Sequence, residues 1–514
     1  MHKRMLMLLT VLLGILLSIK VITGWEAEPA KNELVILQGS IPDSIDPARN
    51  SSLENALPIT GVYEGLVKLN PETLEPEPCL ADSWEVSEDG KRWTFYLKPG
   101  IQFSDGTACD AEAVKFSMSR VMALQDSEPY ASFIFGPVSS IETGERYTVS
   151  FLLKQPFAPF LKNLALPFGA PVVSPTAIKK YGDDFWKHQS GTGPYIFVQS
   201  DKNKIVLQYN SRYRGGPPSI KKIVIKAVPD SPARSKMLLD RKADIIIRPG
   251  PEQIEKMRAN GMKIASLPGL DVSYLGFYTD RAPFNNKYLR YAIAYALDRD
   301  KIVADALGGE GVPAAGLLPP PLSTIKNAGG RHSTDQVRRI LAREGYPGGI
   351  SLTLITYEDS RRYCPPGGRS LAEEIRKQLE PAGITVNIKS MPWEKYKEAI
   401  RNKTGDFFLY GWTGDNGDPD NFLYTLLSSS QIDQGLNTSG YKNSKLDVYL
   451  VTAQRVSDKK SRDKLYGQAE NIILEEVPVA AINHSVFRIA HTPFVKDIKI
   501  SSLGVFNLHN INKL

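Results

Sequence analysis

The chain is 514 residues long, with 42% apolar and 23% charged residues, and its 63 Lys and Arg against 56 Asp and Glu give a net charge of +7. At about 150 residues per domain, this length predicts about three domains or sub-domains of ordinary globular composition. The basic residues do not gather in runs, as they do in nucleic-acid binders, so we exclude nucleic acid as a partner.

The N-terminus has the pattern of an export signal. Two basic residues within positions 2–4 precede an apolar stretch at 5–19, which Lys20 ends. This stretch is shorter than the about 20 residues of a membrane span, and its charge order favours a signal peptide over a core helix. We therefore expect residues 1–24 to be a signal peptide, whose loss removes three basic residues and lowers the net charge from +7 to +4. Because no Cys follows the stretch, we expect a free protein of the periplasm, or of the outer face of the cytoplasmic membrane, and no lipid anchor.

The first half of the chain predicts mainly strands. The expected elements are a strand at 34–37, a β-hairpin at 84–97 turning at 88–90, a helix at 110–122 capped by Asp110, and strands at 205–209 and 220–228. The hairpin is indicated by apolar and polar residues that alternate on both sides of a turn ending in glycine.

The second half alternates helices and strands. The expected elements are a helix in two pieces over 286–306 with Asp300 capping the second piece, a strand at 350–356, a helix at 370–379, a strand at 384–389 and a strand at 407–410. The segment from 350 to 389 is a predicted βαβ unit. This alternation predicts α/β lobes with buried sheets.

Motifs that carry catalysis or bind metals are missing from the sequence. There is no phosphate-binding glycine loop, nucleophile elbow or paired-histidine zinc helix, and the histidines show no ligand spacing. The three cysteines, Cys79, Cys109 and Cys364, match no zinc pattern, and both a Cys79–Cys109 disulfide and buried free thiols remain open. We predict no catalytic residue, no metal and no cofactor.

The most unusual local sequence is the loop at 411–422, which reads Gly-Trp-Thr-Gly-Asp-Asn-Gly-Asp-Pro-Asp-Asn-Phe. One interpretation is a surface loop, because Gly, Asp and Asn favour turns. A calcium site is a second, although the EF-hand spacing fails and Pro419 stiffens the loop. The third is the rim of a cation-binding cleft, where Asp415 and Trp412 face a ligand at the carboxyl end of a strand.

A second loop follows another predicted strand and begins with Arg361 and Arg362. Exposed arginines in loops are usually solvated. The alternative is an anion site, because a guanidinium can bind a carboxylate through two parallel hydrogen bonds.

Together the two loops resemble a known family. The segment 411–422 is similar, nearly letter for letter, to a loop of the dipeptide-binding subgroup of the family-5 extracellular solute-binding proteins of ABC importers, and 361–365 resembles that subgroup's Arg-Pro-Tyr-Asn-Pro segment. The wider family pattern extends along almost the whole mature chain, at residues 80–84, 103–107, 191–195, 274–277 and 292–298.

The resemblance implies an α/β, two-lobed periplasmic-binding-protein-like fold of type II, with an extra sub-domain inserted in the first lobe. It places the inserted sub-domain at 61–184 and lobe II at 270–483, and it assembles lobe I from residues 33–60, 185–269 and 484–514. The closing of the lobes around the ligand follows the hinge mechanism of such proteins.

By resemblance, Asp415 holds the α-ammonium group of a bound peptide and Arg361 holds its α-carboxylate. This sequence has Arg362 where the family has proline and Cys364 where it has asparagine, so Arg362 is the alternative carboxylate ligand. Gly411 lies on the same loop as Asp415.

Two further contributions to the site are expected. The indole of Trp412 forms an apolar and cation–π wall near the ammonium group. Backbone groups near Gly39 and Ser40, on the first lobe, close over the peptide.

The implied function is that of the substrate-binding component of an ABC peptide importer, a monomer that captures a dipeptide or short peptide and delivers it to permease and ATPase subunits. The alternatives are another ligand of the same family (oligopeptide, haem, glutathione or a nickel chelate), an envelope peptidase, and a receptor without transport. We predict a binding protein and not an enzyme.

Overall fold

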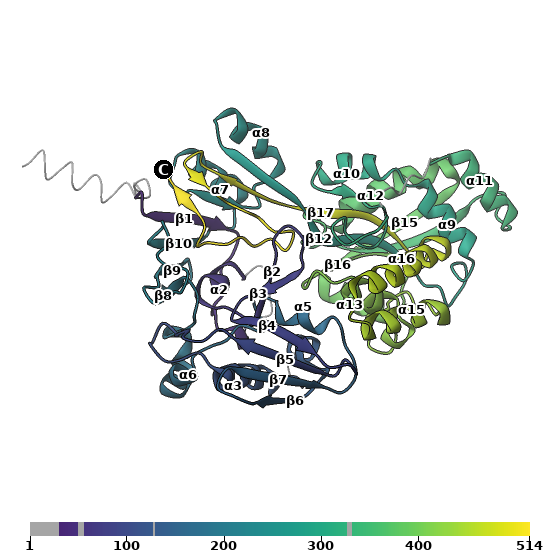
Figure 1. Cartoon of the computed structure of the whole chain (residues 1–514). Coiled ribbons are helices and arrows are strands. Elements are labelled where there is room, and N and C mark those ends of the chain that lie inside the picture. The colour runs from purple at the N-terminus through teal and green to yellow at the C-terminus, as the bar shows by residue number, and fades with distance from the viewer. Residues whose placement is uncertain (1–29, 50–55, 127–128, 326–331) are drawn as a thin grey trace, which may run out of the picture.

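The computed structural model describes residues 30–49, 56–126, 129–325 and 332–514 (Figure 1). The expected signal peptide at 1–24 lies outside the described residues. Within them, no helix combines the length and the apolar character that crossing a membrane requires.

One mixed sheet connects both halves of the described chain. Its strands follow the order β15 (Ile384–Met391), β14 (Ile350–Tyr357), β16 (Phe407–Thr413), β12 (Lys263–Phe277), β17 (Val479–His491), β11 (Ile245–Ile247), β1 (Glu33–Gln38), β10 (Lys222–Ala227), β9 (Lys204–Tyr209) and β8 (Tyr195–Ser200), with β13 (Val312–Pro313) beside β17. Lobe I contains β1 and β8–β11, and lobe II contains β14–β16. The two long antiparallel strands β12 and β17 run from one lobe into the other, as Figure 1 shows. The two-lobed fold is therefore confirmed.

The sub-domain of lobe I contains a second, antiparallel sheet. Its order is β4 (Ala81–Val86), β5 (Arg92–Leu97), β7 (Thr148–Leu153) and β6 (Val138–Thr143), and a short pair β2 (Val67–Leu69) and β3 (Pro76–Pro78) lies beside it. Phe95, Phe151 and Phe160 pack edge to face beneath this sheet, with ring centroids 5.4 to 5.7 Å apart. The predicted hairpin is β4–β5, and Gly90 takes a φ of 69° in its turn, a conformation that glycine adopts without steric cost.

Helices cover the faces of both lobes. Lobe I and its sub-domain carry α2 (Ala56–Val62), α3 (Ala111–Met122), α4 (Pro129–Phe135), α5 (Phe160–Leu164), α6 (Pro175–Tyr181), α7 (Ser231–Leu239) and α8 (Pro251–Ala259). Lobe II carries α9 (Lys287–Ala296), α10 (Arg299–Leu307), α11 (Thr334–Arg343), α12 (Gly368–Leu379), α13 (Trp393–Arg401), α14 (Asp420–Leu427), α15 (Ser444–Arg455) and α16 (Lys459–Glu476). A small pair, β18 (Val495–Lys496) and β19 (Asn512–Lys513), lies near the C-terminus.

Local sequence signals account for many of these elements. Asp110 caps α3 by accepting a hydrogen bond from the Ala113 amide, as predicted. The predicted βαβ unit is β14–α12–β15, whose strands pair in parallel, and α12 buries Leu371 and Ile375 on its inner face.

The prediction that Asp300 caps the second piece of the 286–306 helix is wrong. The cap is Asp298, whose backbone is extended and whose carboxylate accepts from the Lys301 amide at 2.9 Å. Asp300 lies two residues after the cap, in the first turn, where its charge favours the helix N-terminus without capping it.

All three cysteines are buried free thiols. The structure therefore has buried thiols at Cys79 and Cys109 and no disulfide between them. Burial raises the pKa of the Cys79 thiol to about 12, and that of Cys364 to about 12 as well, which leaves both protonated and unreactive at neutral pH.

Candidate ligand-binding site

The two loops singled out in the sequence follow neighbouring parallel strands. Strand β14 pairs in parallel with β16, so their carboxyl ends open at the same edge of the sheet. Arg361 follows β14 and Asp415 follows β16. The loops touch, because the ring of Tyr363 lies on Gly411, where an added Cβ would come within 2.3 Å of the ring. Only glycine fits at position 411.

Strand β16 is longer than the sequence predicted. The strand expected at 407–410 continues to Thr413, because β12 provides a pairing partner for each added residue. Trp412 is therefore on the strand, opposite Val272, and not in the loop. Its indole N–H donates to Asn421 Oδ1 at 2.9 Å, which fixes the ring against the start of α14.

Most polar side chains of the loop after β16 serve the fold. The buried Asp418 carboxylate receives two hydrogen bonds from the Arg462 guanidinium, at 2.8 and 2.9 Å, and this cation holds the pKa of Asp418 below its usual range although burial opposes it. Asn416 Nδ2 donates to Asn163 Oδ1 at 2.7 Å, which joins the loop to the inserted sub-domain. These contacts explain the loop's composition without a calcium ion.

Asp415 differs from its neighbours, because its partly buried carboxylate has no hydrogen bond or ion pair with any described residue. Burial raises the pKa of Asp415 to about 7; Arg362 opposes this shift, and Asp271 adds to it. The buried hydroxyl of Tyr130 also has no hydrogen-bond partner among the described residues, and Asp415 adds to the increase in its pKa. A cation placed beside Asp415 would restore the interaction that burial has removed.

Arg361 carries a positive charge that no carboxylate of the described residues neutralises. Its guanidinium carbon lies 3.5 Å from the centroid of the Trp393 ring, and its buried Nε has no hydrogen-bond partner in the described structure. Two backbone hydrogen bonds between Arg361 and Cys364, at 2.9 and 3.1 Å, fix the turn. Stacking on the indole orients the planar guanidinium and leaves its edge available for an anion.

Arg362 is already paired within the protein. Its Nε lies 2.9 Å from Asp271 Oδ2, and the two side chains are 10% and 1% exposed. Its Nη2 donates to the Leu503 carbonyl at 3.2 Å, in the C-terminal segment that Figure 1 shows in lobe I. Arg362 therefore neutralises a buried carboxylate and links the lobes, whereas Arg361 remains available.

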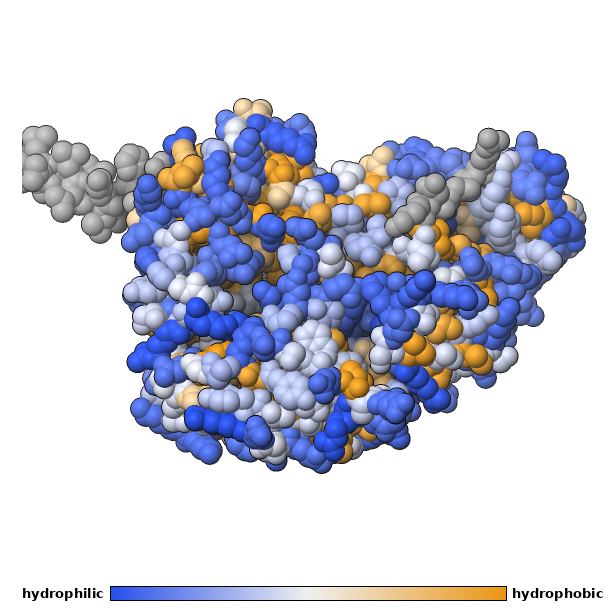
Figure 2. All heavy atoms as spheres, in the orientation of Figure 1, coloured by the Kyte–Doolittle hydropathy of each residue, from blue (hydrophilic) through white to orange (hydrophobic). Residues whose placement is uncertain are grey.

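Gly39 and Ser40 lie across a hollow from Arg362, which is on the loop that follows β14. Both are exposed at the end of β1, and they line a hollow of about 140 Å³ together with Arg362. A larger hollow of about 650 Å³ shares Arg362 and Arg248 with it, and it opens where Figure 2 shows the surface indented between α8 and α10. We call this larger hollow the arginine hollow. Asp415 and Trp412 are not among the described residues that line either hollow.

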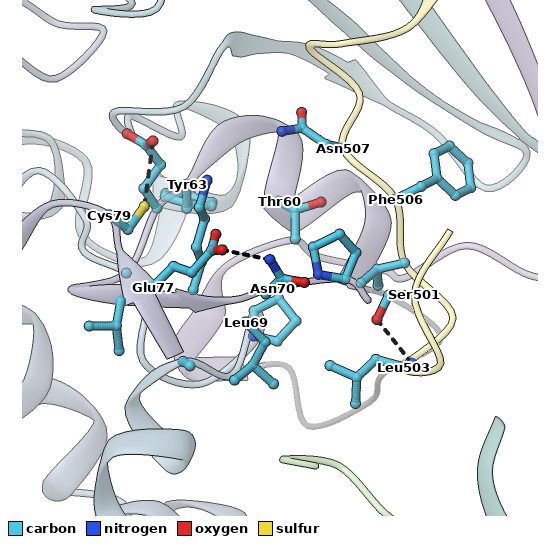
Figure 3. Close-up of a pocket in the computed structure, with 18 of the residues that line it drawn as sticks. Thr60, Tyr63, Leu69, Asn70, Glu77, Cys79, Ser501, Leu503, Phe506 and Asn507 are labelled. Atoms are coloured by element: carbon cyan, nitrogen blue, oxygen red, sulfur yellow. Dashed lines mark hydrogen bonds between the residues drawn. The ribbon is translucent and has the colours of Figure 1, made fainter. Parts of the chain in front are cut away.

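A further pocket, of about 460 Å³, lies between α2, the β2–β3 pair and the C-terminal segment (Figure 3). Two ion pairs lie in its lining, Arg214 with Glu64 and Lys499 with Glu72. Arg214 lies 2.7 Å from Glu64, and Asn70 donates to Glu77 at 2.6 Å, the contact drawn in Figure 3. Lys68, in the same lining, has no ion-pair partner among the described residues and is exposed to solvent, unlike the part-buried charges of Asp415 and Arg361.

The sequence interpretation missed two residues that belong to the site's surroundings. Asp271 is a carboxylate in the buried, mainly apolar second half of strand β12. A buried acid in such a segment requires a cation, and this was the signal available in the sequence. Tyr130 gave no signal, because it is one of 22 tyrosines and its position near Asp415 results from the tertiary fold.

The sheet order, the two crossing strands and the cleft between the lobes define a type II two-lobed binding protein. The chain belongs to the bacterial extracellular solute-binding proteins of family 5, since the family model described as "Bacterial extracellular solute-binding proteins, family 5 Middle" matches residues 75–434. It is 29% identical over 485 residues to the dipeptide-binding protein of Escherichia coli, covering 88% of this chain and 89% of that one. It is 31% identical over 475 residues to heme-binding protein A of Haemophilus influenzae, covering 86% and 85%. The solved structure of HbpA2 from Haemophilus parasuis has a TM-score of 0.85 at 26% identity, covering 94% of this chain and 100% of that one.

Proposed function

We propose that this protein is the substrate-binding component of an ABC peptide importer and captures a dipeptide between Asp415 and Arg361. The observation that supports this proposal is the pair of opposite, uncompensated charges at the carboxyl ends of neighbouring parallel strands. The relative named for dipeptide binding supports the same ligand class.

A dipeptide suits this arrangement because it is a zwitterion in water. Enclosing it removes water from both of its charges, which costs several kcal/mol per ion unless each charge meets a partner. Asp415 accepts hydrogen bonds from the α-ammonium group, and Arg361 donates two to the α-carboxylate. Because both partners are fixed on one lobe, the spacing between them measures peptide length: each added residue lengthens the ligand by at most about 3.3 to 3.6 Å.

Closure of the two lobes would add lobe I contacts to the peptide held on lobe II. Three contacts already bridge lobe II and lobe I with its sub-domain: Asn416 with Asn163, Lys162 Nζ with the Gly417 carbonyl at 2.7 Å, and Arg362 with the C-terminal segment. In the proposed cycle, Gly39 and Ser40 cover the peptide as the hinge at β12 and β17 closes.

The proposal includes the protein's setting. The chain is exported to the periplasm or the outer face of the cytoplasmic membrane, acts as a monomer, and delivers its ligand to permease and ATPase subunits. It binds its ligand without chemical change, so incubation with peptides leaves them intact.

The test combines variants with blocked peptides in calorimetric titrations of the ligand-free mature protein. Asp415→Asn should weaken Ala-Ala binding by about 10- to 100-fold, the worth of a hydrogen bond to a charged group, and Arg361→Gln should do the same. Asp415→Asn should cause no further loss with N-acetyl-Ala-Ala, nor Arg361→Gln with Ala-Ala-amide. Arg369→Gln is the matched control, since it removes the same charge from an exposed position nearby. Wild-type affinity in both variants would refute the proposal, and haem would then be the ligand to test next.

A further inference from the structure

Arg362 is largely buried where the two lobes meet the crossing strands. Its Nε lies 2.9 Å from Oδ2 of Asp271, on β12, and its Nη2 donates to the Leu503 carbonyl at 3.2 Å. The side chain therefore connects three parts of the molecule: the loop after β14 in lobe II, a crossing strand, and the C-terminal segment of lobe I. Capture of a dipeptide by Asp415 and Arg361 gives Arg362 no task of its own.

Asp271 lies where the pairing of the two crossing strands is interrupted. The register of β12 and β17 shifts between Pro268 and Val272, and such irregularities bend a strand. Ser485, on β17, donates to Asp271 Oδ2 at 2.5 Å, so the carboxylate of one crossing strand is bonded to the other. Burial alone would raise the pKa of Asp271, but the charge of Arg362 helps to hold it below its usual range, and the carboxylate is ionised at neutral pH. The ion pair therefore fixes Arg362 at the hinge.

The Leu503 carbonyl, at the other end of Arg362, belongs to a tight turn of the C-terminal segment. The Ser501 amide donates to the Val505 carbonyl at 2.9 Å and closes this turn. Further along the segment, the Leu508 carbonyl accepts a hydrogen bond at 3.3 Å from the hydroxyl of Tyr195, on β8. The acceptor is thus attached to lobe I, whereas the donor is attached to lobe II and to the hinge.

These attachments oppose separation of the lobes. With its Nε held by Asp271, the guanidinium reaches the Leu503 carbonyl only while the lobes stay at about this separation. Wider opening breaks a hydrogen bond from a charged donor, which is stronger than a bond between neutral groups. A proline, the residue that the family pattern has at position 362, could make neither contact. We call the hydrogen bond from Arg362 to the Leu503 carbonyl the latch.

We propose that Arg362 is a positioning residue, which holds the two lobes close enough to capture a peptide without binding the peptide itself. This inference rests on the proposed function and adds to it a residue that sets affinity through closure. Arg361, which lines the arginine hollow, binds the α-carboxylate, and the latch limits how far its loop moves from lobe I. Apparent affinity falls in proportion to the fraction of molecules in the competent arrangement, so loss of the latch weakens all dipeptides by the same factor.

The test is the double variant Arg362→Met with Asp271→Asn, which removes the latch and leaves no unpaired charge buried. Calorimetry of the mature protein should show Ala-Ala and Ala-Ala-amide both weakened, each by about 10-fold, the worth of a hydrogen bond from a charged group. Small-angle X-ray scattering without added peptide should show a larger radius of gyration than for the wild type. Arg362→Lys keeps a cation for Asp271 but loses the forked donors, so it should change both readouts in the same direction, and it serves if the double variant does not fold.

Arg290→Met is the matched control. Arg290 is 3% exposed and donates to the Phe284 and Val477 carbonyls at 2.7 and 3.0 Å, so its contacts lie within lobe II. This variant should be less stable to urea but should keep the wild-type radius of gyration and the wild-type affinity for both peptides. A general loss of stability is thereby separated from loss of the latch.

The latch and the proposed function fail in different ways. A loss confined to Ala-Ala, with binding of Ala-Ala-amide unchanged, would mean that Arg362 contacts the α-carboxylate directly and would overturn the latch. Either an unchanged radius of gyration or an unchanged affinity in the folded double variant would also overturn it. If the wild-type protein binds neither peptide, the proposed function is refuted, and the scattering comparison still decides whether Arg362 holds the lobes together.

Discussion

Peptide affinity should fall steeply as the pH is lowered below 7, because the proposed ammonium partner must be ionised. The pKa of Asp415 is raised to about 7, mainly by burial, in the ligand-free protein. At pH 5 a group with this pKa is about 99% protonated, so the affinity for Ala-Ala should be about 100-fold lower than at pH 7.5. Above about pH 8 the peptide's own α-amino group loses its proton, which should lower the affinity again.

The sign of the effect on stability is opposite to that of an ordinary surface aspartate. The folded-state pKa of Asp415 lies above the ordinary value of 3.8 for an aspartate, so the unfolded chain loses its proton first as the pH rises. The ligand-free protein should therefore lose stability between about pH 4 and pH 7 and change little above pH 7 through this group. A bound ammonium group should reverse this loss, since it favours the ionised form.

Calorimetry at several pH values tests this account directly. Titrations at pH 6.5 in two buffers of different ionisation enthalpy should show release of most of one proton per peptide bound. Asp420→Asn is the matched control, because the pKa of Asp420 is also about 7 but its carboxylate accepts a hydrogen bond from Gln454. That variant should keep the pH dependence of binding, whereas Asp415→Asn should lose it. A constant affinity from pH 5 to 7.5 would refute the reasoning.

Three further substitutions have defined outcomes. Arg462→Met leaves the Asp418 carboxylate buried without its cation, and urea denaturation should show a loss of about 3 to 5 kcal/mol in the free energy of unfolding. Gly411→Val drives a side chain into the Tyr363 ring, so calorimetry should show Ala-Ala binding weakened by at least about 10-fold, since 1.4 kcal/mol of strain gives that factor. Arg361→Lys keeps the charge but loses the planar stacking and the paired donors, and affinity for Ala-Ala should drop by about 10-fold, close to the loss for Arg361→Gln. Unchanged stability in the first variant, or unchanged affinity in the others, would contradict the assigned contacts.

Local structure could be predicted well from the sequence, because its determinants lie within a few residues. The Asp110 cap, the β4–β5 hairpin and the β14–α12–β15 unit depend on side-chain alternation, capping and turn residues. The error at Asp300 arose where local signals did not decide between two candidates. Two aspartates flank the start of α10, and which of them caps depends on the backbone conformation that tertiary packing selects.

The site could be predicted only in part. The two loops were recognisable from their residues, and the parallel pairing of β14 and β16 brings them to one edge of the sheet. The partner of Arg362 could not be predicted, because Asp271 lies 91 residues away and nothing local links the two. The end of β16 was missed for a similar reason, since its added residues depend on pairing with the distant strand β12.

The most direct test of the central claim is calorimetric titration of the ligand-free mature protein with Ala-Ala, Ala-Ala-Ala and N-acetyl-Ala-Ala. If Asp415 and Arg361 bind the two ends of one dipeptide, Ala-Ala should bind far more tightly than the longer or the acetylated peptide. Equal binding of all three, or binding of none, would contradict the account and would leave the family-5 fold with a different ligand.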